Sequence, residues 1–159
     1  MDIAIGLIPA AASYQLRQAV LRPHQRIDEV GDKVDDEPGT ATFGATDRAR
    51  GALVAVGTVF REAAPFDPAQ AGGPAATWRL RWMATRHDVQ GQGIGSMVLN
   101  AALDHVAAES GGLLWCNARV GAIGFYERAG FSAWGDVWVI PGIGPHVVMW
   151  RRIETGTTT

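Results

Sequence analysis

Cysteine, lysine and charge are all scarce in this chain of 159 residues. Cys116 is the only cysteine, so no disulfide can form within the chain, and Lys33 is the only lysine. Charged residues make up 19% of the sequence, below the usual ~25%, while the apolar share of 47% is ordinary for a globular protein. A core of this size folds without metals or disulfides. We therefore expect one folded domain over residues 1–153 and a disordered tail over 154–159.

Long apolar runs and a basic surface are missing as well. No segment approaches the ~18 consecutive apolar residues of a membrane span. The start of the chain carries Asp2 and lacks the basic region of a signal peptide. A net charge of −2 and a pI near 6.0 do not suit a nucleic-acid-binding protein. We expect a cytoplasmic protein that binds neither membranes nor nucleic acids.

The charges are unevenly distributed along the chain. Six acids and one base lie between Asp28 and Glu37, a local net charge of −5. The rest of the chain has 13 bases, all arginine, against 10 acids. Arginine suits phosphate binding, but the base composition of the source genome explains its use equally well. We interpret the acidic stretch as a solvated loop; the alternative is that it steers a cationic amine toward the protein.

Apolar periodicity predicts an α+β fold, with a mixed sheet of about seven strands flanked by helices in three layers. The predicted strands are 2–8, 40–46, 52–61, 77–85, 113–116, 131–140 and 146–152. The predicted helices begin at Pro9, at Ile94 and at Ala122.

Two features of the 63–85 region follow from composition and alternation. The stretch 63–76 is rich in proline, alanine and glycine, and we expect an exposed excursion without a core. In the strand that follows, strict alternation assigns the side chains to two faces. One face holds Trp78, Leu80, Trp82 and Ala84, and the other holds Arg79, Arg81 and Met83.

Glycine is the one residue in clear excess, at 20 of 159 or about 13% against an average near 7%. Gly91, Gly93 and Gly95 stand at every second position. They lie where the chain leaves the predicted strand 77–85 and enters the helix that begins at Ile94. A glycine-rich turn before a helix N-terminus binds anions, because free N–H groups and the helix dipole converge there. The dinucleotide pattern G-x-G-x-x-G does not fit this turn, and the Walker pattern lacks its Gly-Lys-Ser/Thr. A tight connection without a ligand is the alternative.

The sequence Gln90-Gly91-Gln92-Gly93-Ile94-Gly95 resembles the Q/R-x-x-G-x-G/A signature of the GNAT superfamily of N-acetyltransferases. Downstream, Asn117 and the segment 124–131, GFYERAGF, resemble the family's asparagine and its F-Y-x-x-x-G-F motif. The resemblance extends from Asp2 to Ile153, and the stretch 16–23 is similar to a bacterial branch of small GNAT enzymes. It implies a GNAT-like fold with acetyl-CoA as cofactor and no metal.

The resemblance also implies which residues bind acetyl-CoA. The N–H groups of the turn would hold the pyrophosphate, the end of the strand 77–85 would pair with the pantetheine arm, and Asn117 would contact CoA near it. The turn residues are Gln90, Gly91, Gln92, Gly93, Ile94, Gly95 and Ser96, and the strand residues are Met83, Ala84 and Thr85. Capping of the following helix is the alternative for Asn117. Cys116 we interpret as a small core residue.

Tyr126 is, by the same resemblance, the acid that protonates the departing thiolate. A phenol near ~10 and a thiol near ~8.5 make this transfer uphill by only about 2 kcal/mol. The alternative is a core aromatic beside Phe125. Many GNAT enzymes carry an acidic base on the fourth or fifth strand, whereas 78–85 and 113–118 contain no acid. His146 is our first candidate base, followed by His24, Glu62 or a water chain.

The sequence thus predicts an acyl-CoA-dependent N-acyltransferase, in which a primary amine of a small molecule or peptide attacks acetyl-CoA directly in a ternary complex. Arg22, His24, Trp82 and Ile143 are the expected acceptor-binding residues. The missing strand acid keeps a rival open, a non-catalytic CoA-binding or regulatory module. A domain without a ligand is a weaker rival. Edge strands of such sheets often pair, which leaves a homodimer as an option.

Overall fold

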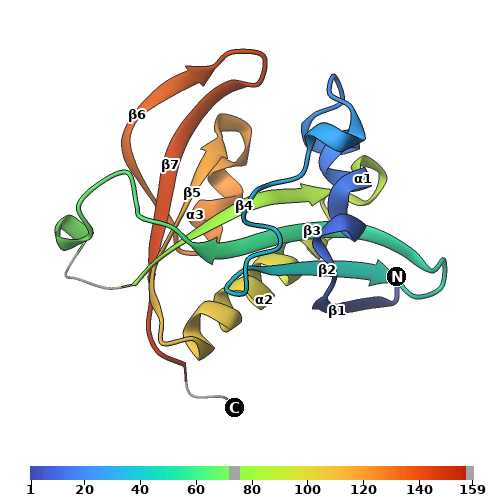
Figure 1. Cartoon of the computed structure of the whole chain (residues 1–159), viewed down its shortest axis with the longest axis horizontal. Helices are drawn as coiled ribbons and strands as arrows, with labels where there is room; N and C mark the ends of the chain where they lie inside the picture. Colours follow the sequence, from blue (N-terminus) through green and yellow to red (C-terminus); the bar gives the residue numbers. More distant parts are fainter. Residues whose placement is uncertain (72–75, 157–159) are drawn as a thin grey trace. The chain divides into compact units, whose positions relative to one another are not determined.

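The computed structural model describes residues 1–71 and 76–156 and is drawn in Figure 1. The strands are β1 (Ile3–Leu7), β2 (Ala41–Asp47), β3 (Ala52–Arg61), β4 (Thr77–Thr85), β5 (Gly112–Arg119), β6 (Ser132–Ile140) and β7 (Gly144–Ile153). The α-helices are α1 (Tyr14–Leu16), α2 (Ile94–Ala108) and α3 (Ile123–Arg128). Each strand and helix predicted from periodicity has a counterpart among these elements. None of the helices in the described part of the chain is long and apolar enough to cross a membrane.

The strands form one mixed sheet in the order β1-β2-β3-β4-β5-β7-β6. Antiparallel pairing joins β1 to β2, β2 to β3, β5 to β7 and β7 to β6. Parallel pairing joins Thr77–Arg79 of β4 to Leu113–Trp115 of β5, and α2 makes the crossover that a parallel pair requires. The predicted mixed α+β sheet is confirmed.

The helical segment after β1 changes its geometry along its length. It begins as a 3₁₀ turn (Ala10–Ser13), continues as α1 and ends as a π-helix (Arg17–Leu21). The Arg22 N–H donates to the carbonyls of Arg17 and Gln18, which closes the wider π-turn. Such turns are often found at functional sites.

The chain divides into two compact units. Unit 1 consists of Met1–Phe60 and Leu80–Leu103, and unit 2 of Arg61–Arg79 and Asp104–Thr159.

Unit 1 buries apolar side chains on both faces of its strands. On one face, Leu16 of α1 packs with Val56 of β3. On the other face, Gly57 leaves the space that Met83 and Val98 of α2 fill: a Cβ there would be 3.2 Å from the Val98 side chain and closer still to the Met83 sulfur. Successive strand residues point to opposite faces. The segment containing α1 and the helix α2 therefore cover opposite faces of these strands.

Unit 2 has an aromatic core, in which Phe66 packs with Leu113, Trp115 and Val148. The Phe66 ring also stacks on Trp134, with 4.8 Å between the ring centroids. The prediction that the loop 63–76 has no core is therefore wrong for Phe66, because one aromatic ring supplies enough apolar area to anchor a loop on a sheet. The rest of that loop at 72–75, and 157–159 of the predicted tail, lie outside the described residues.

Candidate functional site

A glycine-rich turn connects β4 to α2 in unit 1. Gly91 and Gly93 have φ angles of +79° and +80°, in the left-handed region that glycine adopts at no steric cost. The Met97 N–H donates to the Gly93 carbonyl at 3.2 Å, which makes it a helical bond at the start of α2. The N–H groups just before Met97 therefore have no acceptor within the helix. Residues 90–93 are exposed, so the turn is open to an anionic ligand such as a phosphate.

The Gln90 side chain ties this turn to the end of β4. Its Nε2 donates to the Thr85 carbonyl at 3.0 Å and lies 3.3 Å from Nδ1 of His87. Arg86 donates two hydrogen bonds of 3.0 and 2.6 Å to Asp88, and these bonds lower the pKa of that carboxyl. The acidic charge beside the turn is therefore paired with a guanidinium.

The regular geometry of β4 breaks at Trp82. Its φ is +63°, a conformation that costs about 1–3 kcal/mol for a residue other than glycine. Hydrogen bonds at the two ends of the β3-β4 pair reveal one extra residue. The Glu62 N–H donates to Thr77 at 3.2 Å, and the Arg86 N–H donates to Val54 at 2.8 Å. Between these two bonds β4 advances nine residues, from Thr77 to Arg86, whereas β3 advances only eight, from Val54 to Glu62. The extra residue in β4 defines a β-bulge.

The bulge places two consecutive side chains, Arg81 and Trp82, on the same face. The Arg81 guanidinium lies 4.5 Å from the centroid of the Trp82 ring, and both side chains donate to Asp32. Met83 then points toward α2, as Trp78 does. The predicted alternation is wrong from Trp82 onward, because a residue with positive φ reverses the direction of the side chains that follow.

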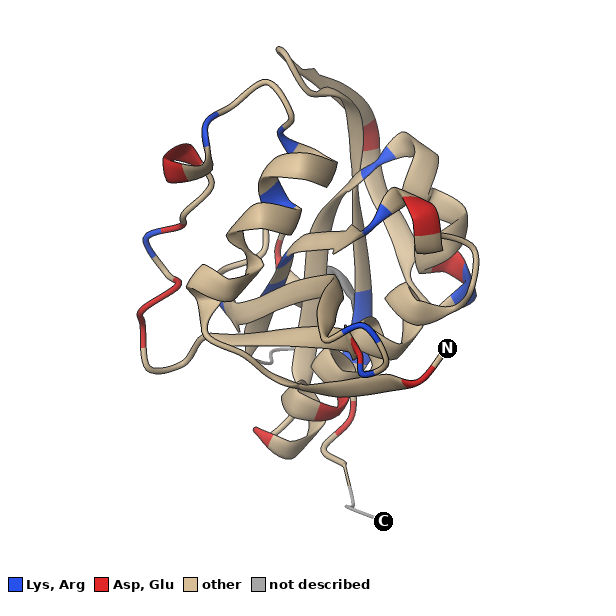
Figure 2. Ribbon diagram, turned by 90° about the vertical axis from the view of Figure 1, so that its right-hand side faces the viewer, with Lys and Arg blue, Asp and Glu red and all other residues tan. Residues whose placement is uncertain are grey.

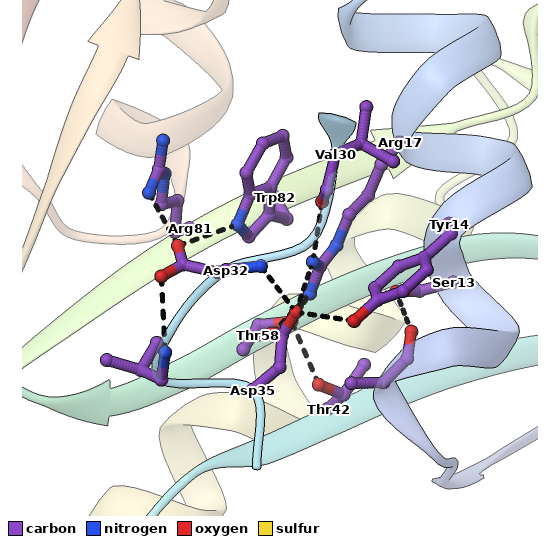
Figure 3. A network of polar contacts seen from close by, with 12 residues as sticks. Ser13, Tyr14, Arg17, Val30, Asp32, Asp35, Thr42, Thr58, Arg81 and Trp82 are labelled. Atoms are coloured by element: carbon purple, nitrogen blue, oxygen red, sulfur yellow. Dashed lines mark hydrogen bonds and ion pairs between the residues drawn. The ribbon is translucent and has the colours of Figure 1, made fainter. Parts of the chain in front are cut away.

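Asp32 uses both carboxylate oxygens in this arrangement (Figure 3). Its Oδ2 accepts a hydrogen bond from Arg81 and one of 3.1 Å from Nε1 of Trp82, while Oδ1 accepts the Val34 N–H at 3.3 Å. Burial raises the pKa of Asp32, but the hydrogen bond from Trp82 and the charge of Arg81 outweigh it, so the pKa is lowered. Asp32 is an ionised anchor rather than a free base.

Arg17 and Asp35 form a buried ion pair beneath Asp32. Their side chains are 0% and 1% exposed. Two parallel hydrogen bonds of 2.8 and 2.9 Å join the guanidinium to the carboxylate. The guanidinium also donates to the Val30 carbonyl and to the Thr58 hydroxyl, both at 3.0 Å. Its Nε is buried without a hydrogen-bond partner among the described residues.

Asp35 fixes the position of the loop that carries Asp32. It accepts the Tyr14 hydroxyl at 3.0 Å and the Asp32 N–H at 2.8 Å. Burial raises the pKa of Asp35, but its hydrogen bonds from Arg17 and from the backbone outweigh burial and lower it. The carboxylate is therefore ionised at neutral pH.

The acidic stretch 28–37 is thus only partly solvated. The prediction of a solvated loop is wrong for Asp32 and Asp35, whose charges face arginines, while Asp28, Glu29, Asp36 and Glu37 are exposed as expected. Figure 2 shows acidic and basic stretches alternating along this part of the ribbon. Composition gave no signal for the inward carboxylates, since their partners lie far away in the sequence.

Two of the acceptor-binding residues predicted in unit 1 come together. The Arg22 guanidinium lies 5.3 Å from the centroid of the Trp82 ring, and Arg17 lies 4.7 Å from it. Trp82 itself is only 6% exposed. His24 lies on an exposed turn after the π-helix.

Tyr126 and Cys116 form a buried pair in unit 2. Tyr126 packs between Phe125 and Phe131, with ring centroids 5.1 and 5.4 Å away, and its hydroxyl hydrogen-bonds to the Cys116 sulfur. Burial raises the pKa of the Cys116 thiol to about 12 and raises the pKa of Tyr126 well above its ordinary value. Both groups are therefore neutral, and the interpretation of Cys116 as a small core residue is confirmed.

His146 is buried at the start of β7 with one ring nitrogen engaged. Its Nδ1 lies 2.8 Å from the Gly144 carbonyl, and its ring centroid is 5.9 Å from that of Trp138. A carbonyl can only accept, so Nδ1 carries a proton and donates it to Gly144. Nε2 is therefore the ring nitrogen that is left for another hydrogen-bond partner.

Asn117 and Ile143 occupy different settings in unit 2. Asn117 pairs with Val148 in the β5-β7 ladder. The alternative that Asn117 caps a helix is wrong, because the following helical turns begin at the caps Arg119 and Ala122. Ile143 is half-buried in the turn between β6 and β7.

Comparison with known proteins gives a consistent family match. Residues 38–133 match the family model described as "Acetyltransferase (GNAT) domain". The uncharacterized N-acetyltransferase YitI of Bacillus subtilis (strain 168) is 32% identical over 154 residues, which cover 96% of this chain and 98% of YitI. The glycine turn lies inside the matched family segment, whereas Asp32 and Asp35 lie before it.

Solved structures share the fold at low identity. FeeM, an N-acyl amino acid synthase from uncultured soil microbes, aligns with a TM-score of 0.74 and 15% identity, over 96% of this chain and 91% of its own. NAA60 of Arabidopsis thaliana in complex with acetyl-CoA aligns with a TM-score of 0.71 and 15% identity, over 96% of this chain and 99% of its own.

Proposed function

Because the chain belongs to the GNAT family of acetyltransferases, we propose that it transfers the acetyl group of acetyl-CoA to a primary amine of a small molecule or peptide. The family supports N-acetyltransferase activity in general. The observation that carries the choice of cofactor is the exposed turn with positive φ at Gly91 and Gly93, which leads into α2. Its free N–H groups suit the pyrophosphate of CoA.

The remaining contacts to the cofactor are those that the GNAT family implies. The pyrophosphate lies on the N–H groups of residues 90–96, and the pantetheine arm pairs with the backbone of Met83–Thr85. The bulge at Trp82 supports this role for β4, since bulges interrupt regular pairing and occur next to active sites. That the related fold of NAA60 has been solved with acetyl-CoA also supports it.

The chemistry we propose is direct attack of the neutral amine on the thioester in a ternary complex. Tyr126 gives its proton to the departing thiolate, and its raised pKa keeps it protonated at neutral pH. His146 takes the proton of the amine through Nε2, because Nδ1 is engaged with Gly144. The amine of a small molecule or peptide is the acceptor, and FeeM, an N-acyl amino acid synthase of similar fold, supports an acceptor of this kind.

A second candidate function is a CoA-binding module without catalysis. The burial of Tyr126 against Cys116 favours it, because a phenol with a raised pKa is a weaker acid. To separate the two, free thiol is followed while the protein is incubated with acetyl-CoA and a library of amines. Thiol release above background with any amine supports the enzyme, and release with none supports the module.

Titration calorimetry with acetyl-CoA tests the cofactor. We expect binding at tens of micromolar or tighter, and at least about a tenfold loss of affinity in Gly93→Ala, because alanine disfavours the φ of +80° that arranges the turn.

Gly135→Ala is the matched control for this titration. Gly135 also has a positive φ, +74°, and no atom lies within 4 Å of its added Cβ, but it belongs to β6. This variant should bind acetyl-CoA like the wild type. Absence of wild-type binding, or an equal loss in both variants, contradicts the proposed site.

A further inference from the structure

Asp32 holds the β-bulge of β4 from outside the strand. It is not adjacent to Arg81 or Trp82 in the sequence, yet Oδ2 alone accepts hydrogen bonds from both of them (Figure 3). These two side chains share a face only because of the positive φ at Trp82. An ionised carboxylate that binds both donors therefore favours the bulged over the regular strand.

The position of Asp32 is itself fixed by buried contacts. Its N–H donates to Asp35 at 2.8 Å, and Asp35 is paired with Arg17. Arg17 in turn donates to Thr58 of β3, the neighbour of β4 in the sheet. The loop is thus anchored to β3, the strand next to β4, and Asp32 cannot shift without breaking its hydrogen bond to the buried Asp35 carboxylate.

The residues after the bulge depend on its geometry. Met83 fills the space above Gly57, and Thr85 accepts a hydrogen bond from Gln90 of the glycine turn. Both lie within three residues of Trp82, so the φ of Trp82 sets the path of the backbone from Met83 to Thr85. In a strand without the bulge, the N–H and C=O groups of Met83–Thr85 would point in other directions.

We propose that Asp32 is a positioning residue for acetyl transfer: by holding Arg81 and Trp82 it keeps the backbone of Met83–Thr85 in the conformation that pairs with the pantetheine arm. This inference rests on the proposed function. Asp32 acts through Trp82 and does not touch the reacting atoms, since both of its oxygens are already hydrogen-bonded.

The test measures two ligands by titration calorimetry. One is acetyl-CoA, and the other is adenosine 3′-phosphate 5′-diphosphate, which is CoA without its pantetheine arm. The variants are Asp32→Asn, which removes the charge, and Trp82→Phe, which removes the indole donor but keeps an aromatic ring. Asp36→Asn is the matched control, an exposed acid of the same loop.

We expect Asp32→Asn and Trp82→Phe to bind acetyl-CoA about tenfold more weakly than the wild type, and the nucleotide fragment within about twofold. Asp36→Asn should match the wild type with both ligands. In ¹H-¹⁵N spectra, the indole N–H signal of Trp82 is identified by its absence in Trp82→Phe. In Asp32→Asn this signal should change its chemical shift, because its hydrogen-bond acceptor has lost its charge.

Each other outcome has one meaning. Unchanged acetyl-CoA binding in folded Asp32→Asn, or in Trp82→Phe if Asp32→Asn does not fold, overturns the inference. An equal loss for both ligands also overturns it, since the change is then a general loosening of the unit. A wild type that binds the fragment but gains nothing from the pantetheine arm overturns it too. A wild type that binds neither ligand instead refutes the proposed function.

Discussion

Arg17–Asp35 in unit 1 and Tyr126–Cys116 in unit 2 are both buried polar pairs, but the first is an ion pair and the second is neutral. The first pair keeps both charges: Tyr14 and the Asp32 N–H donate to the carboxylate, and the guanidinium donates to the Val30 carbonyl. The second pair stays neutral, and burial raises the pKa of both groups. Hydrogen bonds and the charge of Arg17 thus outweigh burial at Asp35, whereas burial outweighs the charge of Arg79 at Cys116.

The difference separates the roles of the two pairs. A charged pair joined by two parallel hydrogen bonds fixes a loop in one position, because any displacement leaves a buried charge unpaired. A neutral pair has no charge that a displacement could leave unpaired. Unit 1 thus contains a charged anchor for a loop, and unit 2 contains a buried pair that keeps its protons at neutral pH.

Breaking the charged pair should have the largest effect. Asp35→Asn leaves the guanidinium of Arg17 buried without its carboxylate, and we expect the free energy of unfolding to fall by about 3–5 kcal/mol. Urea denaturation followed by circular dichroism measures it. Asp36→Asn, an exposed neighbour, should stay within about 0.5 kcal/mol of the wild type. A similar loss in both variants would mean that the pair does not hold the loop.

The pH dependence of stability should differ between the two pairs. Asp32 and Asp35 have lowered pKa values in the folded state, so their stabilisation is complete above the unfolded value near ~3.9 and is lost as the pH falls below it. Cys116 and Tyr126 have raised pKa values. Their stabilisation is complete below the unfolded thiol value near ~8.5 and is lost as the pH rises toward the folded Cys116 value of about 12.

Urea midpoints measured from about pH 2.5 to 10.5 test this contrast. Asp35→Asn should flatten the acid limb only, and Cys116→Ala the alkaline limb only. If either substitution changed both limbs equally, the pairs would not differ in the way described.

The smallest effect on stability should come from the neutral pair. Tyr126→Phe removes one hydroxyl and its hydrogen bond to Cys116, and we expect a loss of about 0.5–1.5 kcal/mol. Turnover with an accepted amine should fall by at least about a hundredfold, the lower end of the range for a general acid. Unchanged turnover in the folded variant would remove Tyr126 from the proposed mechanism.

The glycine turn was predictable because its information is local. The turn at Gly91 and Gly93 lies between β4 and α2, and α2 begins at Ile94, where the pattern places it. Tyr126 is buried beside Phe125, as the alternative interpretation of a core aromatic has it. In these cases a window of a few residues contains both the signal and its cause.

The hydrogen bonds from Arg81 and Trp82 of β4 to Asp32 were not predictable in this way. Asp32 lies within an acidic run whose other members are mostly exposed, and its partners at 81 and 82 are about 50 positions away. The bulge at Trp82 also has no glycine to mark it, so alternation along the strand gave the wrong face for that residue. Only long-range contacts distinguish Asp32 and Asp35 from Asp36.

The sequence by itself determined the strand and helix order, the glycine turn before α2 and the resemblance to the family. These depend on periodicity and on the backbone freedom of glycine, which act over short stretches. The tertiary structure decided which carboxylates are buried, which way Trp82 faces and which protons Tyr126 and Cys116 hold. Those properties depend on the distance between charges and on exclusion of water, and both arise only when distant segments pack together.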